Sequence, residues 1–176
     1  MAGITLNGKL CSLRALEPDD LDFLYTLEND MGIREISNTL KPYSRAVLKE
    51  YLRNAHRDIF EVKQLRLCVC SGEQERIGLV DLFDFDPKHK RAGIGIIILN
   101  TVDRNKGVGA EALQLLMNYS FHVLELHQIY ANILEDNLAS IHLFEKLGFE
   151  KIGVKKEWMR WGGSFKNELM YQKIKS

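Results

Sequence analysis

A loop of small and basic residues between positions 104 and 110 is the segment of this chain best suited to bind a ligand. An apolar stretch, Ile94 to Leu99, precedes the loop, and a segment with helical apolar periodicity follows it. Backbone N–H groups at a helix start, together with the positive end of the helix dipole, bind phosphate groups. The loop therefore predicts a phosphate or pyrophosphate site. Its residues are Arg104, Asn105, Lys106, Gly107, Val108, Gly109 and Ala110.

The same glycines also match a dinucleotide-binding pattern. Residues 107–112 satisfy G-x-G-x-x-A, which is typical of nicotinamide- and flavin-dependent oxidoreductases. That pattern needs its first glycine directly after a strand, whereas Asn100 to Lys106 separate Leu99 from Gly107 here. No acidic residue is well placed at the end of a second parallel strand. A dinucleotide-binding oxidoreductase is therefore the less well matched alternative.

A second motif lies near the C-terminal third of the chain. It reads Asn137-x-x-Ser140-x-x-x-Phe144-x-Lys-Leu-Gly-Phe149. Combined with the R/Q-x-x-G-x-G/A loop, it resembles the GNAT superfamily of acetyl-CoA-dependent N-acetyltransferases, and most of all its polyamine and ribosomal-protein branch. The resemblance implies an α/β fold with a mixed sheet, in which central strands splay apart and helices flank the sheet. It also implies direct transfer of acetyl from acetyl-CoA to a primary amine of a small molecule or peptide in a ternary complex.

The resemblance further assigns residues to acetyl-CoA. The 104–110 loop would hold the pyrophosphate, and the backbone of residues 96–98 would pair with the pantetheine arm as a short extra strand. The asparagine at position 137 would reach the pantetheine amide, and the following helix would pack on the cofactor. Outside the loop, the assigned residues are Ile96, Ile97, Ile98, Asn137, Ser140 and Phe144. The glycines in Gly93-Ile94-Gly95 indicate a bulge or a close backbone approach, with tight packing of a neighbouring helix as the alternative.

The chain departs from the family at the position of the general acid. Many members protonate the leaving thiolate with a tyrosine, but Phe144 stands at that position and cannot donate a proton. A thiol of pKa ~8.5 leaves as an anion at pH 7 at a cost of only about 2 kcal/mol. General acid catalysis is usually worth roughly 10²–10⁴-fold. A slower or water-assisted enzyme is therefore still expected, and Tyr130 is a candidate substitute for the missing acid.

The acceptor side is altered as well. Relatives often carry a glutamate after the alanine of this strand, where this chain has Gly93 after Ala92. The remaining acids on the preceding strand, Asp81 and Asp84, are candidates for binding an ammonium or accepting its proton. They are three apart on a strand, which predicts opposite faces and a role for only one. Asp84 matches an acidic position of the polyamine branch and is preferred, although a solvated strand end is an open alternative.

These departures leave a second class of function open, namely a GNAT-like protein that binds acetyl-CoA for sensing or assembly with little catalysis. A metal site is not expected, because His89 lies in a turn among basic residues despite its neighbours Asp84 and Asp86. The acids Glu28, Asp30 and Glu35 lie where relatives shape the acceptor pocket and are equally well explained as surface charges.

The bulk composition fits one enzyme domain over residues 1–176. The 24 basic and 24 acidic residues balance, so nothing predicts nucleic acid or an anionic membrane as a partner. Neither a signal peptide nor an apolar run of membrane-spanning length is present. With three cysteines and no C-x-x-C pair, the chain suggests buried thiols of the cytosol, among them Cys68 and Cys70. We expect a cytoplasmic protein, with a homo-oligomer possible.

The periodicity predicts seven strands and four helices to position these groups. The helix after Ser44 is expected to bury Val47, Leu48, Tyr51 and Leu52. Asn137 is predicted to cap the last helix and Gly148 to end it. Residues 30–44 allow no prediction. The expected strands are Lys9–Leu16, Gln64–Cys70, Arg76–Asp86, Arg91–Leu99, Gln128–Leu134, Lys151–Arg160 and Phe165–Ile174, and the expected helices are Pro18 to about Asn29, a second after Ser44, Val108 to about Val123, and Leu138–Leu147.

Overall fold

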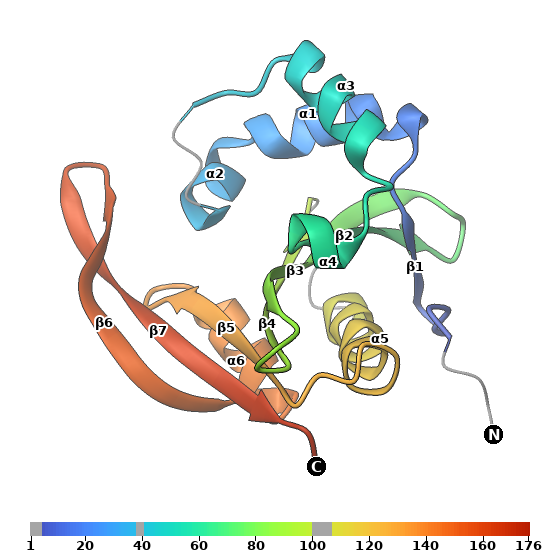
Figure 1. Ribbon diagram of the computed structural model, residues 1–176. Helices are drawn as coiled ribbons and strands as arrows, with labels where there is room; N and C mark the ends of the chain where they lie inside the picture. Colours follow the sequence, from blue (N-terminus) through green and yellow to red (C-terminus); the bar gives the residue numbers. More distant parts are fainter. Residues whose placement is uncertain (1–4, 38–40, 100–106) are drawn as a thin grey trace.

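The computed structural model describes residues 5–37, 41–99 and 107–176. A seven-stranded mixed sheet in the order β1-β2-β3-β4-β5-β7-β6 forms its centre (Figure 1). The strands are β1 (Cys11–Ala15), β2 (Leu65–Ser71), β3 (Arg76–Asp86), β4 (Arg91–Ile98), β5 (Gln128–Leu134), β6 (Glu150–Trp161) and β7 (Ser164–Ile174). The helices are the 3₁₀ turn η1 (Pro18–Asp20), α1 (Leu21–Asn29), α2 (Met31–Ser37), α3 (Arg45–Asn54), α4 (Ile59–Val62), α5 (Val108–His122) and α6 (Leu138–Lys146).

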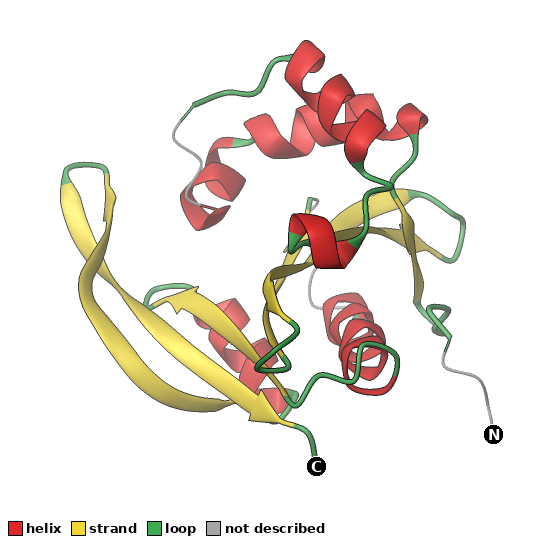
Figure 2. Ribbon diagram, in the orientation of Figure 1, coloured by secondary structure: helices red, strands yellow, loops and turns green. Residues whose placement is uncertain are grey.

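The sheet separates two apolar clusters, because successive residues of a strand point to opposite faces. Val69, Val80 and Ile94 pack with α5 and α6 on one side. On the other side, Leu79 and the fully buried thiols of Cys68 and Cys70 pack with α1, α2 and α3. The predicted burial of these two cysteines is therefore confirmed. Figure 2 shows the helical layers on both sides of the sheet.

The two parallel central strands share only a short ladder. β4 and β5 pair over Arg91–Gly93 and Gln128–Tyr130. Beyond that point β4 continues to Ile98 along β3, and β5 continues to Leu134 along β7. The strands therefore separate, as the expected splay requires, and this confirms the predicted fold class.

Local signals explain where the helices begin and end. The Ser44 side chain accepts a hydrogen bond from the Val47 N–H at 3.2 Å, and Asn137 Oδ1 accepts one from the Ser140 N–H at 3.2 Å. Gly148 follows α6 with φ +81°, a left-handed conformation that favours glycine. The predicted Asn137 cap and Gly148 stop are confirmed, and the helix expected after Ser44 begins there.

Two short helices were not predicted, and one residue predicted to be buried is exposed. The helices α2 and α4 have seven and four residues, which is too short to display a helical apolar period. Val47 was expected on the inner face of α3 but is 53 % exposed. Leu48 and Leu52, four residues apart, supply the buried stripe, and Val47 lies about 100° around the helix from Leu48.

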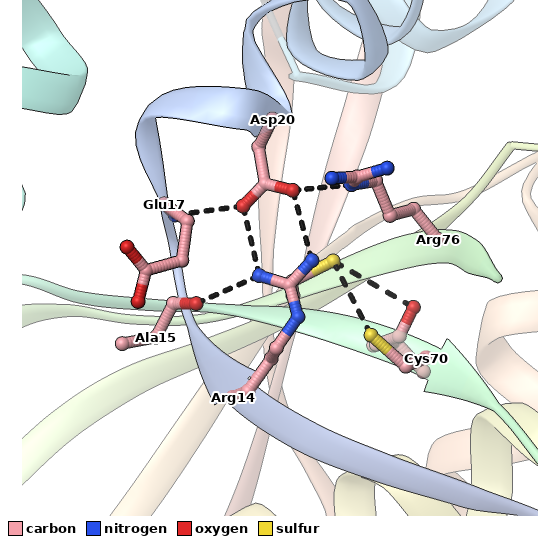
Figure 3. A network of polar contacts seen from close by, with 8 residues as sticks. Arg14, Ala15, Glu17, Asp20, Cys70 and Arg76 are labelled. Carbon is pink, nitrogen blue, oxygen red and sulfur yellow. Dashed lines mark hydrogen bonds and ion pairs between the residues drawn. The ribbon is translucent and has the colours of Figure 1, made fainter. Parts of the chain in front are cut away.

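A buried carboxylate fastens the start of the helical layer to the sheet (Figure 3). Asp20 is fully buried and forms a bidentate pair with Arg14 at 2.8 and 2.8 Å, a pair with Arg76, and a hydrogen bond from the Glu17 N–H at 2.7 Å. Burial alone would raise the pKa of Asp20, but these hydrogen bonds lower it to about 2. The cluster joins η1 to β1 and β3.

Candidate active site

The first turn of α5 lies beside the opening between β4 and β5. Gly107 is the N-cap residue of α5 and has φ +84°, which a residue with a Cβ rarely adopts. Val108, Gly109 and Ala110 then form the first helical turn. Arg104, Asn105 and Lys106 lie outside the described residues. The described part of the loop thus has the helix start that the phosphate-site prediction requires.

The space around Gly109 is large enough for a residue with a Cβ. A Cβ at Gly109 would meet Leu143 Cδ2 at 3.6 Å and Ile96 Cδ1 at 3.7 Å, which are ordinary contacts. The turn therefore packs between β4 and α6 without requiring a glycine. Approach of a ligand to the backbone is a sufficient reason for one here.

Glu111 anchors the same turn of α5, and sequence reasoning missed it. Its carboxylate accepts hydrogen bonds from the N–H groups of Lys9, Leu10 and Cys11 at 2.9, 2.6 and 2.8 Å. Burial would raise the pKa of Glu111, but these three hydrogen bonds lower it. A Cβ at Gly8 would lie 2.4 Å from Glu111 Oε2, so the glycine allows the chain to wrap around the carboxylate. An acid in the first helical turn was the available signal.

The isoleucines of β4 turn their side chains to alternate faces. Ile96 packs with the cluster under α5 and α6, whereas Ile97 packs with the cluster under α1–α3. One backbone edge pairs with β3 through Val80, Leu79 and Gly78. The other edge faces the opening left by β5. Residues 96–98 therefore have the geometry that pairing with a pantetheine arm requires, although that contact stays a prediction.

The second motif forms the start of α6. Because Asn137 Oδ1 caps Ser140, the amide nitrogen of Asn137 is the atom left to donate to a pantetheine carbonyl. Phe144 is only 3 % exposed and packs edge-on against Phe149, with ring centroids 5.0 Å apart. Phe144 is therefore a core residue, and its contact with the cofactor stays a prediction.

Asp84 lies where the two central strands separate. The β3–β4 register shifts between Phe83 and Asp86, and Asp84 has φ +49°. The Tyr130 hydroxyl donates a hydrogen bond to Asp84 Oδ2 at 3.3 Å. Tyr130 is also the last β5 residue paired with β4. The bulge therefore places an exposed carboxylate beside the opening.

An aromatic ring explains the glycine at position 93. A Cβ there would lie 2.2 Å from Phe83 Cε2, because the Phe83 ring covers Gly93. That ring packs edge-on against Tyr130, with centroids 5.9 Å apart. The alternative of helix packing is therefore wrong, and the close approach comes from a side chain of the neighbouring strand. A glutamate at position 93 would require Phe83 to move.

Asp81 belongs to a buried ion-pair cluster with Arg66 and Glu28. It is 8 % exposed and accepts a hydrogen bond from Arg66 Nε at 2.6 Å, while Arg66 Nη1 pairs with Glu28 Oε1 at 2.6 Å. The alternation used to place Asp81 and Asp84 on opposite faces does not hold, since the left-handed bulge at Asp84 interrupts it. Asp84 is the more accessible of the two carboxylates.

Tyr130 is poorly suited to serve as a proton donor to a thiolate. Burial, and then the neighbouring Asp84 carboxylate, raise its pKa to about 12. Tyr130 is thus a weaker acid than an ordinary tyrosine of pKa ~10. At neutral pH its hydroxyl stays protonated and serves as a hydrogen-bond donor to Asp84.

Residues around His89 have structural partners. The His89 backbone N–H donates to Asp86 Oδ1 at 2.9 Å, and Arg91 pairs with Asp86 at 3.4 Å. Within residues 5–37, 41–99 and 107–176, no three His, Cys, Asp or Glu residues are grouped as metal ligands would be. Among those same residues, no helix has the length and apolar character needed to span a membrane.

Known proteins resemble this chain over most of its length. Residues 11–150 match the family described as an acetyltransferase (GNAT) domain. Spermidine N(1)-acetyltransferase of Vibrio cholerae is 33 % identical over 148 residues, which are 84 % of this chain and 83 % of that protein.

Solved structures agree with the sequence comparison. The crystal structure of spermidine N-acetyltransferase from Vibrio cholerae in complex with CoA and spermine matches with a TM-score of 0.85 at 29 % identity, over 95 % of this chain and 96 % of that one. A dodecameric structure of spermidine N-acetyltransferase from Vibrio cholerae in an intermediate state matches with a TM-score of 0.80 at 29 % identity, over 95 % of both chains.

Proposed function

Since this chain belongs to the GNAT acetyltransferase family and is an acetyl-CoA-dependent N-acetyltransferase of amines, we propose that its acceptor is a polyamine of the spermidine class. The observation that carries the proposal is the exposed Asp84 carboxylate, held by Tyr130 where β4 and β5 separate. The similar enzymes are named for spermidine, and one was solved with spermine. A dinucleotide-dependent oxidoreductase is set aside, because the family match covers the glycine-rich loop.

The donor side of the proposed site uses main-chain groups. The N–H groups at the start of α5, from Gly107 to Ala110, would bind the pyrophosphate. The backbone of β4 and the amide of Asn137 would orient the pantetheine arm. Acetyl-CoA supplies the activated acetyl group as a thioester. The chain's contribution on this side is to hold that thioester at the opening between the strands.

Asp84 handles the acceptor in this proposal. An alkyl amine resembles lysine, with a pKa of ~10.4, and arrives mostly as an ammonium. The Asp84 carboxylate attracts the ammonium and takes up its proton, directly or through water, so that a neutral amine can attack the thioester carbonyl. Tyr130 orients Asp84 for this task. As the amide forms, the attacking nitrogen releases its second proton to water, and the leaving thiolate takes a proton from water in turn, because Phe144 has none to donate.

A panel of amines tests the proposed acceptor. CoA thiol release is followed with spermidine, spermine, n-butylamine, an amino sugar and a short peptide with a free N-terminus. We expect kcat/KM to be highest for spermidine or spermine. A higher kcat/KM for the amino sugar or the peptide would assign the acceptor to that class instead.

The assembly and the compartment are also proposals. Apolar side chains on the β6–β7 hairpin are exposed, and this hairpin extends beyond the rest of the sheet (Figure 1). They are Ile152, Val154, Trp158 and Phe165. Exposed apolar patches commonly mark an interface, and a relative forms a dodecamer. We propose a homo-oligomer that works in the cytoplasm, and light scattering of the purified protein tests the assembly.

A further inference from the structure

Helix α2 connects the two sides of the opening between β4 and β5. On the β4 side, Ile33 is 2 % exposed and belongs to the same apolar cluster as Ile97 and Leu99. On the β5 side, Glu35 pairs with Lys166, which is 131 residues away in sequence. The helix therefore lies across the mouth through which an acceptor would reach Asp84.

Lys166 joins three separate elements. Its ammonium contacts Glu35 of α2 and Asp136 Oδ2, at 2.6 Å, in the turn after β5, while its own backbone belongs to β7. Hydrogen bonds with Asp136 and then with Glu35 raise the pKa of Lys166, so the ammonium stays charged. The Lys166 and Glu35 side chains are 24 % and 29 % exposed, which shields their contact from solvent more than a fully exposed pair.

The turn at Asp136 is itself rigidly attached to β7. Asn167 donates from its backbone N–H and its side-chain amide to the Glu135 carboxylate, both at 2.9 Å. The Glu135 N–H donates to the Asn167 carbonyl at 3.1 Å. Asp136 immediately precedes Asn137, the cap of α6 and the residue assigned to the pantetheine amide. Lys166 thus connects α2, on the proposed acceptor side, to the turn before Asn137, on the proposed donor side.

We propose that Lys166 is a positioning residue, which fixes α2 relative to the Asp136–Asn137 turn and thereby shapes the entrance for the acceptor. The inference rests on the proposed placement of the acceptor beside Asp84. Without the ammonium, Glu35 and Asp136 repel each other, and α2 keeps its apolar packing at Ile33 and the hydrogen bond from the Ile33 N–H to Asp30 Oδ1. Acceptor binding then weakens, while the first turn of α5, which packs against Ile96 and Leu143, still binds the donor.

Steady-state kinetics of Lys166→Met provide the first test. We expect KM for the acceptor to rise about tenfold with kcat changed less than about twofold, because the loss is in binding. Calorimetry should give an unchanged Kd for CoA. Lys155→Met is the matched control, since Lys155 lies on the same hairpin and pairs with Glu168 at 2.8 Å instead of with α2. That control should leave the acceptor KM unchanged.

A charge swap separates positioning from general stability. E35K and K166E should each raise the acceptor KM, because like charges then meet. The E35K/K166E double variant restores an ion pair between positions 35 and 166 but places a glutamate at position 166 beside Asp136, so it should recover part of the loss seen in K166E. A K166M variant with lower melting temperature but an unchanged acceptor KM would show a purely structural role and overturn the inference. A double variant whose acceptor KM is no lower than that of K166E would overturn it as well.

A wrong assignment of the acceptor would give a different result from a wrong role for Lys166. In that case the wild-type protein would not prefer spermidine or spermine in the amine panel. The KM comparison would then use the acceptor that the panel identifies. If wild type acetylates polyamines and K166M matches K155M, only the role of Lys166 is overturned.

Discussion

The Tyr130 hydroxyl lies 3.3 Å from Asp84 Oδ2, and Tyr130 belongs to the last residue pair that joins β4 to β5. This contact links β3, which carries Asp84, to β5, which carries Tyr130 and forms one side of the opening. It holds a carboxylate in a left-handed bulge, where φ is +49°. An aspartate tolerates this conformation better than most residues with a side chain. The most accessible candidate base is therefore held by a hydroxyl group that stays protonated at neutral pH.

Gly109→Asp tests the donor site. The aspartate adds bulk and negative charge at the helix start where the pyrophosphate is expected, so CoA affinity should fall more than about tenfold. Calorimetry measures the Kd, and circular dichroism checks that α5 still forms. Gly109→Ala is the control, because its Cβ has room at 3.6 and 3.7 Å from its neighbours. Equal affinity for CoA in the aspartate variant and wild type would place the pyrophosphate elsewhere.

Phe144→Tyr tests the missing general acid. The added hydroxyl supplies the proton donor that the family resemblance assigns to this position, and we expect kcat to rise about tenfold. CoA affinity should be retained, since the ring is kept. Phe144→Ala should instead lower the free energy of unfolding by about 3–5 kcal/mol, because a buried ring that packs on Phe149 is lost. An unchanged kcat in a folded tyrosine variant would indicate that thiolate protonation does not limit turnover.

Asp20→Asn tests the buried cluster of Figure 3. The pKa of Asp20 is lowered from 3.8 to about 2, so the ionised group stabilises the fold above pH 3.8 and loses this effect as the pH falls toward 2. The shift corresponds to about 2 kcal/mol. Leaving two arginines without their carboxylate should cost about 3–5 kcal/mol in the variant at neutral pH. Urea denaturation at several pH values measures both effects, and a pH-independent difference between the two proteins would contradict this role of Asp20.

The sequence predicted the long elements, because their periodicity and caps are local, and its resemblance to the GNAT superfamily implied the splayed strands. It could not place Phe83 over Gly93, since a strand pattern gives no register between neighbouring strands. It also gave no sign of the bulge at Asp84, which invalidated an argument from strict alternation. The Lys166–Glu35 contact joins residues that are far apart in sequence, and α2 is too short to show a helical apolar period. Such features depend on tertiary packing, which one sequence does not reveal.

The central claim is that Asp84 receives the acceptor ammonium at the opening of the sheet. The most direct measurement compares kcat/KM for spermidine between wild type and Asp84→Asn, which keeps the side-chain volume and removes the charge. The account predicts a loss of about 10²-fold or more, with an unchanged Kd for CoA. Asp86→Asn is the matched control on the same strand, because Asp86 pairs with Arg91 and the turn at His89. Full activity of Asp84→Asn on spermidine would contradict the account and place the base elsewhere.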